Sequence, residues 1–187
     1  MLEAYQIGFE ESQEPILGFI HDDCVCMERG WDERVLREFD DPHVGLVGFG
    51  GALGFCDPEL YRKPYELPQL ARHHFRSNLR EAEVHGERFT GECDVVILDG
   101  FALFVRRQLL EETGGWPIDT PISYYMYDAF ICCEAMRHHW KIRLVGVACD
   151  HLERRSAGMG QDGQFDYEGS HWWIYLHYRD VLPAEVK

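Results

Sequence analysis

Two kinds of apolar pattern alternate along this chain of 187 residues, and together they predict an α/β layer structure. Short runs dense in Ile, Leu, Val and Phe are typical of buried strands, and they occupy residues 16–20, 44–55, 93–107 and 141–151. Segments whose apolar residues recur every three or four positions predict helices over residues 2–13, 30–39, 107–115, 127–140 and 170–182. We expect helix 107–115 to end at its glycine pair.

Two segments depart from this alternation. Residues 56–92 are broken by Pro58, Pro64 and Pro68, and their second part has the pattern of a helix over 67–84. Residues 158–169 are rich in glycine and precede the aromatic helix. We therefore expect a core domain over residues 1–156, and a C-terminal aromatic tail helix within 157–187 that packs on the same domain.

The balance of acidic and basic residues limits the kinds of ligand that the protein can bind. The chain has 33 acidic and 18 basic residues, a formal net charge of −15, and it has no cluster of Lys and Arg. These features argue against nucleic acid as a partner, and a phosphate ligand on so acidic a protein would need a metal ion beside it. No apolar stretch approaches 18 residues and no signal-peptide pattern opens the chain, so we expect no transmembrane segment.

The cysteines predict a reducing compartment. There are seven, an odd number, and their spacing does not give two C-x2-C pairs. We expect reduced, mostly buried thiols in a cytoplasmic protein, with a zinc site as the less favoured alternative. The seven are Cys24, Cys26, Cys56, Cys93, Cys132, Cys133 and Cys149.

Polar side chains stand at the ends or bends of three predicted strands. They are His21-Asp22-Asp23, Asp99-Gly100 and Asp150-His151. Ligands of parallel sheets bind beyond the carboxyl ends of the strands. Two carboxylates and a distant histidine would suit Mg²⁺ or Mn²⁺, with diphosphate oxygens completing the coordination. The alternative is that the acidic pair begins a turn and caps the helix near residue 30.

Two further residues allow either a structural or a functional interpretation. Asp128, at the start of an apolar helix, is either a first-turn charge on the helix dipole or a general base in a partly dry cleft. Trp116, in the segment TGGWPIDTP, is either a packing anchor or a platform on which a sugar stacks.

Four segments, in order, resemble the motifs of family-2-type glycosyltransferases of the GT-A fold. They are ILGFIHDDCVCMERGW, DPHVGLVGFGGALGF, VVILDGFALFVRRQLLEETGGW and YYMYDAFICCEAMRHHWKIRLVGVACDH. The resemblance covers residues 2–156 and implies a GT-A-like α/β fold with a mixed, mostly parallel sheet flanked by helices. It also implies metal-dependent transfer of a sugar from a nucleotide-diphosphate sugar to an acceptor hydroxyl, by an inverting displacement.

The resemblance assigns a role to each candidate residue. Asp128 would be the catalytic base, Asp23 and His151 would bind Mn²⁺ or Mg²⁺, and His21 and Asp22 would contact the donor. The side facing a carbohydrate or glycan acceptor would be lined by Asp99, Gly100, Trp116 and Tyr127.

Members of the family usually have two or three βα units before the acidic pair, which hold the nucleotide base. This sequence starts at the helix that leads into the pair, so we expect a fold abbreviated at its N-terminus, with a sheet edge covered by the tail, by a second copy or by a partner chain. Two other functions stay open. One is a non-catalytic carbohydrate-binding or assembly module; the other, less favoured, is a metal-dependent hydrolase.

Overall fold

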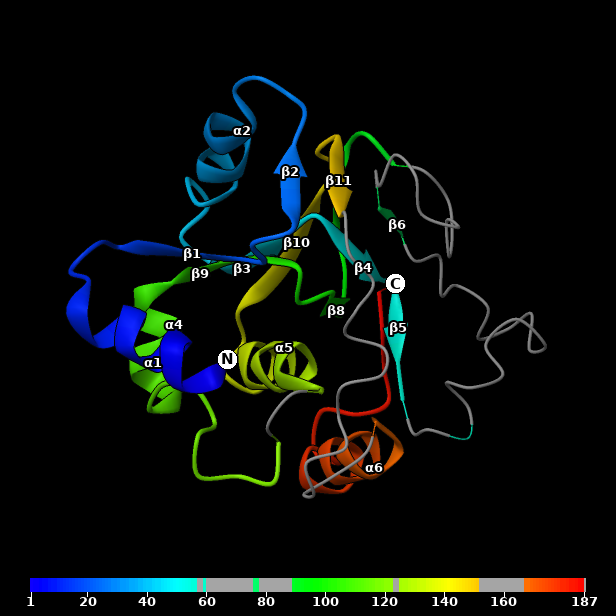
Figure 1. Cartoon of the computed structure of the whole chain (residues 1–187). Helices are drawn as coiled ribbons and strands as arrows, with labels where there is room; N and C mark the ends of the chain where they lie inside the picture. Colours follow the sequence, from blue (N-terminus) through cyan, green and yellow to red (C-terminus); the bar gives the residue numbers. More distant parts are fainter. Residues whose placement is uncertain (57–58, 60–75, 78–88, 123–124, 152–166, 187) are drawn as a thin grey trace.

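The computed structural model describes residues 1–56, 59, 76–77, 89–122, 125–151 and 167–186 (Figure 1). The described helices are α1 (Leu2–Glu11), α2 (Trp31–Glu38), α4 (Arg107–Thr113), α5 (Tyr127–Arg137) and α6 (Tyr167–His177). The first strands are β1 (Ile16–Ile20), β2 (Cys24–Cys26), β3 (Val44–Gly48), β4 (Gly50–Ala52), β5 (Gly54–Phe55) and β6 (Arg76–Ser77). The later ones are β7 (Glu92–Asp94), β8 (Ile97–Leu98), β9 (Ala102–Arg106), β10 (Lys141–Val145), β11 (Cys149–His151) and β12 (Ala184–Glu185). Of the helix predicted over 67–84, the structure describes only Arg76–Ser77, and these two residues form strand β6 and not a helix.

The main sheet has five strands in the order β1-β9-β3-β10-β7. The expectation of an α/β fold with a mixed sheet is confirmed, but the expectation that the sheet is mostly parallel is wrong. Only β3 and β10 are parallel; β1–β9, β3–β9 and β7–β10 are antiparallel. Strands β3 and β9 are apolar and buried almost throughout, as parallel strands are, so their composition does not reveal their direction.

The predicted bend at Asp99-Gly100 is a bulge in a strand pairing. Residues 97–106 run antiparallel to residues 44–52 on both sides of it. Gly51 lies opposite Leu98 and Gly48 opposite Leu103, so three steps on one strand match five on the other. The two extra residues interrupt the pairing between β8 and β9. Such bulges re-aim the backbone locally, and here they turn an amide towards α5.

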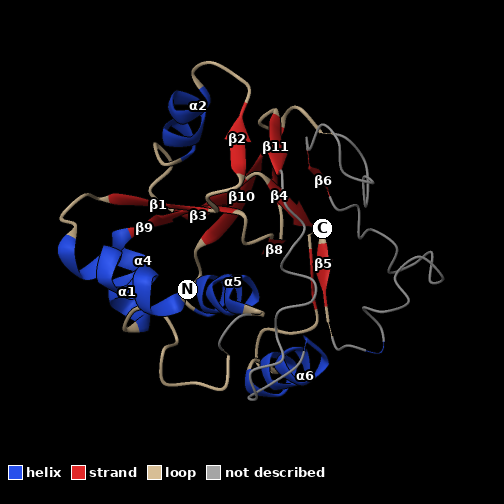
Figure 2. Ribbon diagram, viewed as in Figure 1, coloured by secondary structure: helices blue, strands red, loops and turns tan. Residues whose placement is uncertain are grey.

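The main sheet has helices on both sides of it (Figure 2), and it separates two apolar clusters. Leu103 and Val105 of β9 point into the larger cluster, with α4 and α5, whereas Ala102 and Phe104 point into the smaller one, with Val35 of α2. The alternation follows from the period of two in a strand. Helices therefore cover both faces of the sheet.

Helix α4 ends where its glycines predict. Gly114 adopts a left-handed backbone conformation, with φ of 79°, and the amide of Gly115 donates a 2.7 Å hydrogen bond to the carbonyl of Leu110. A residue with a side chain would be strained at that φ. The stop leads the chain into the segment that carries Trp116.

The C-terminal residues pack on α5 and β5. Tyr178 donates a 2.6 Å hydrogen bond to Glu134, and Arg137 forms a 2.7 Å ion pair with Asp180. Strand β12 pairs antiparallel with β5. The domain boundary at residue 156 stays a prediction. Of the helices that the structure describes, none combines the length and the apolar character needed to cross a membrane.

Candidate active site

The end of β1 and the start of α5 are joined by one hydrogen bond. Nε2 of His21 and the hydroxyl of Tyr127 lie 2.8 Å apart. The Tyr127 side chain is buried, and its ring meets that of Tyr5 of α1 edge-on, with the ring centroids 5.9 Å apart. Burial, followed by the charge of Asp128, raises the pKa of Tyr127, so its phenol is protonated at neutral pH. Residues far apart in the sequence therefore form one polar network beneath the bulge.

The Asp128 carboxylate is held by two backbone amides. Oδ2 accepts a 3.0 Å hydrogen bond from the amide of Gly100, in the bulge, and Oδ1 accepts a 2.8 Å bond from the amide of Ala129. Burial raises the pKa of Asp128 to about 7, and the charge of Asp99 adds to the rise, while the amides oppose it. Asp128 is thus a carboxylate whose ionisation lies near neutral pH.

The bulge explains why Asp99 and Gly100 lie beside this carboxylate. The amide of Asp99 donates a 2.8 Å hydrogen bond to the carbonyl of Gly50, and Oδ1 of Asp99 accepts a 3.2 Å bond from the amide of Phe101. A Cβ at position 100 would overlap the side chain of Tyr127. Glycine is therefore needed for the close approach to α5.

The predicted metal ligands lie on a separate two-stranded ribbon, formed by β2 and β11. Asp22 is exposed, and Asp23, which is half-buried, directly precedes β2. His151 pairs with Cys24, the first residue of β2, so Asp23 and the backbone of His151 lie at the same end of the ribbon. The His151 side chain lies outside the described part. A carboxylate and an imidazole suit Mn²⁺ or Mg²⁺ as a pair of ligands. Within the described ranges, no three His, Cys, Asp or Glu residues gather into a metal-binding group.

Trp116 is buried among three other aromatic rings. It is only 3% exposed, and its ring lies 4.9 Å from that of Phe19, 5.2 Å from that of Tyr5 and 6.4 Å from that of Tyr127. These contacts support the packing interpretation. Its Nε1 is buried and has no hydrogen-bond partner among the residues that the structure describes, and the residue lines a cavity of about 260 Å³ with Thr113. Its acceptor-side role stays a prediction.

The structure thus gathers five predicted site residues around the start of α5, and two groups that sequence reasoning missed. The five are His21, Asp99, Gly100, Tyr127 and Asp128. The missed groups are the Gly100 amide, as a donor to Asp128, and the phenol of Tyr5. The bend at Asp99-Gly100 was a usable signal for the first. Nothing in the helical pattern of residues 2–13 distinguishes Tyr5.

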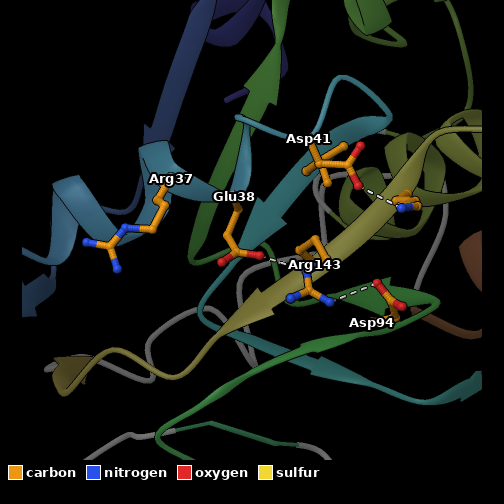
Figure 3. Close-up of a pocket in the computed structure, with 7 residues that line it drawn as sticks. Arg37, Glu38, Asp41, Asp94 and Arg143 are labelled. Carbon is orange, nitrogen blue, oxygen red and sulfur yellow. Dashed lines mark hydrogen bonds and ion pairs between the residues drawn. The ribbon is translucent and has the colours of Figure 1, made fainter.

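A second polar pocket, between α2, β7 and β10, has a structural role (Figure 3). Arg143 contacts Glu38 at 2.7 Å and Asp94 at 3.0 Å, and Lys141 contacts Asp41 at 2.6 Å. Because Arg143 and Lys141 are held by carboxylates, these contacts join α2 and the loop after it to the sheet, whereas Arg37, the third cation at the pocket, is exposed.

Comparison with protein families gives a match that spans most of the chain. The model of a glycosyltransferase-like family matches residues 1–153. This chain belongs to that family. The match contains the predicted acidic pair, the bulge, Asp128 and His151, so the glycosyltransferase resemblance is confirmed. No curated protein matches the chain.

One solved glycosyltransferase structure supports the predicted GT-A-like fold of this chain. The mannosyltransferase PcManGT from Pyrobaculum calidifontis, solved in complex with GDP-Man and Mn²⁺, matches with a TM-score of 0.51 and 16% identity. The match covers 95% of this chain and 49% of the mannosyltransferase, so the chain spans about half of that protein. A197 from STIV matches with a TM-score of 0.44 and 15% identity, over 81% of this chain and 64% of its own.

Proposed function

We propose that the protein transfers a sugar from a nucleotide-diphosphate sugar to an acceptor hydroxyl, with inversion, and that Asp128 is the base. The observation that supports this most directly is the Asp128 carboxylate, half-buried at the start of α5, with a pKa of about 7. A base is most effective when its pKa lies near the working pH.

In this mechanism Asp128 accepts the proton of the acceptor hydroxyl while the oxygen attacks the anomeric carbon of the donor. The bulge amide of Gly100 and the amide of Ala129 fix the orientation of the carboxylate. Protonation by the acceptor removes the repulsion between Asp128 and Asp99, which favours the transfer. The hydrogen bond between Tyr127 and His21 holds the start of α5 against the end of β1.

Asp23 and His151 would hold a divalent cation, and Asp22 and His21 would contact the donor. The position of Asp23 and of the His151 backbone at one end of the ribbon supports this assignment. A bound Mn²⁺ or Mg²⁺ supplies positive charge against the departing diphosphate. The net charge of −15 favours such a cation beside an anionic leaving group. Asp99, Gly100, Trp116 and Tyr127 are proposed on the acceptor side.

Titration calorimetry with Mn²⁺ and a panel of UDP- and GDP-sugars tests the donor part. We expect binding that depends on Mn²⁺ and that is lost in Asp23→Ala. Asp40→Ala is a matched control, because Asp40 is an exposed acid on the loop that follows α2. The same heats in both variants, or no heat from any sugar nucleotide, would contradict the proposal.

Product analysis tests the base. Asp128→Asn should lower the rate of transfer by a factor of about 10²–10⁴ while donor binding is retained. Sugar binding that needs neither nucleotide nor metal, and that persists in Asp128→Asn, would instead favour a non-catalytic carbohydrate-binding module.

A further inference from the structure

Three cysteines lie on one face of the β2–β11 ribbon, and the proposed transferase does not use them. Cys24 and Cys26 are two residues apart on β2, and Cys149 is opposite Cys26 on β11. Since side chains alternate along a strand, all three point to the same side, and Val25 between them is 42% exposed on the other. All three are free thiols in this structure.

The thiols are close, and only one is fully enclosed. The Cys24 thiol lies close enough to the thiols of both Cys149 and Cys26 for each of them to shift its pKa. Cys149 is 0% exposed, within the apolar cluster that contains Val35, whereas Cys24 and Cys26 are half-buried at its border. A small disulfide from solution would therefore meet a β2 thiol first, and Cys149 could react only with a sulfur on its own ribbon.

The backbone register selects one partner for Cys149. The amide of Met27 donates a 2.8 Å hydrogen bond to the carbonyl of Ala148, so that neighbouring pair is hydrogen-bonded. Hydrogen-bonded and non-hydrogen-bonded pairs alternate along an antiparallel ribbon, which makes Cys26 and Cys149 a non-hydrogen-bonded pair. The Cα atoms of such a pair lie about 4.5 Å apart, within the ~4.4–6.8 Å range that a disulfide spans.

Cys24 is the less suitable partner in spite of its contact. It lies diagonally from Cys149, since its own direct partner is His151. Diagonal neighbours in an antiparallel pair have Cα atoms about 7–8 Å apart, beyond the usual span of a disulfide. Contact between two thiols therefore does not by itself decide which disulfide forms.

We infer that Cys26 and Cys149 are a reversible dithiol–disulfide pair that links β2 to β11. In the first step, the sulfur of Cys26, as the thiolate, attacks one sulfur of a low-molecular-weight disulfide such as glutathione disulfide. That S–S bond breaks, a mixed disulfide forms, and one glutathione thiolate leaves. In the second step, Cys149 loses its proton and attacks the Cys26 sulfur, releasing the second glutathione thiolate. Two protein thiols are oxidised, one external disulfide is reduced, and the two protons pass to the released thiolates.

The bond would fix the ribbon whose end carries Asp23 and the backbone of His151. The inference does not depend on the proposed transferase activity, because the chemistry uses only the thiols and their register. Its test also needs no turnover.

The experiment compares the full chain with Cys24→Ser and Cys26→Ser after incubation with glutathione disulfide. Free thiols are alkylated under denaturing conditions, and linked peptides are identified by mass spectrometry without reduction. We expect Cys149 to be linked to the Cys24/Cys26 peptide in the wild type and in Cys24→Ser, and at least tenfold less linkage in Cys26→Ser. Dithiothreitol should restore alkylation of Cys149.

Both serine variants change a half-buried residue on the same strand, so each controls for the folding of the other, and circular dichroism before oxidation checks that both are folded. Linkage that survives in Cys26→Ser but disappears in Cys24→Ser would overturn the inference, because contact and not register would then choose the partner. A Cys149 that stays fully alkylated in oxidised wild type would also overturn it.

Discussion

Replacing Asp128 with asparagine should stabilise the protein increasingly as the pH rises. The pKa of Asp128 is about 7 in the fold, against about 4 in an unfolded chain. A carboxyl whose pKa is raised by folding favours the folded state at low pH, and this contribution is lost as the pH rises through the folded value. The native protein therefore keeps an unfavourable charge at its site above neutral pH.

The magnitude follows from the two pKa values. At pH 5.5 the unfolded carboxyl has already ionised, while the folded one keeps its proton until about pH 7. The gap of about 1.5 pH units, at about 1.36 kcal/mol each, gives a loss of about 2 kcal/mol for wild type between pH 5.5 and 8.5. The side chain introduced by Asp128→Asn does not titrate. The variant loses one acceptor for a backbone amide, which costs about 1 kcal/mol at every pH.

Urea unfolding of both proteins at pH 5.5, 7.0 and 8.5 measures this difference. The stability of Asp128→Asn relative to wild type should rise by about 2 kcal/mol across the series, because every other titrating group is common to both. Asp99→Asn is the internal control. It removes the neighbouring charge, so it should lower the pKa of Asp128. The free energy of unfolding should then begin to level off at a lower pH than in wild type. Parallel stability curves for wild type and Asp128→Asn would refute the argument that burial raises this pKa.

Three further outcomes can be measured. The rate of transfer at saturating donor and metal should rise with pH and level off above about 7, since Asp128 accepts a proton only when ionised; a profile that is flat between pH 6 and 8 would contradict this. Gly100→Ala should lower the free energy of unfolding by about 1–3 kcal/mol through overlap with Tyr127, whereas Gly8→Ala, whose Cβ meets nothing within 4 Å, should be neutral or raise it by up to about 1 kcal/mol. Urea unfolding of both variants tests this, and equal costs would contradict it. Tyr127→Phe should cost about 1 kcal/mol through the lost hydrogen bond to His21, and an unchanged stability would show that this bond contributes nothing.

The sequence predicted the elements well because their signals are local. The strand over 16–20 and the helix stop after 107–113 depend on an apolar run and a glycine pair, and both are found as expected. Strand direction depends instead on which distant segment lies alongside. The apolar runs at 44–48 and 102–106 are buried on both faces in either direction, so nothing in them indicated antiparallel pairing.

In the candidate site, too, the sequence reveals individual residues but not the contacts that depend on distant segments. An acidic residue after a strand is visible in sequence, and Asp99 was chosen on such grounds, as Asp128 was from its place at the start of an apolar helix. Their mutual repulsion, and the amide of Gly100 that holds Asp128, arise from two extra residues in a pairing that joins positions some fifty apart. Tyr5 became part of the network only because α1 packs against Phe19 and Tyr127.

The two-residue bulge restricts how this site can change in evolution. Deleting or adding one residue between β8 and β9, with the rest of the register kept, would rotate β9 by half a period. Leu103 and Phe104 would then exchange faces, and both apolar clusters would lose their fit at once. Changes of an even number of residues avoid that exchange. Relatives should therefore differ in this loop by substitutions, or by insertions and deletions of two residues. Their loop lengths should then be either all odd or all even.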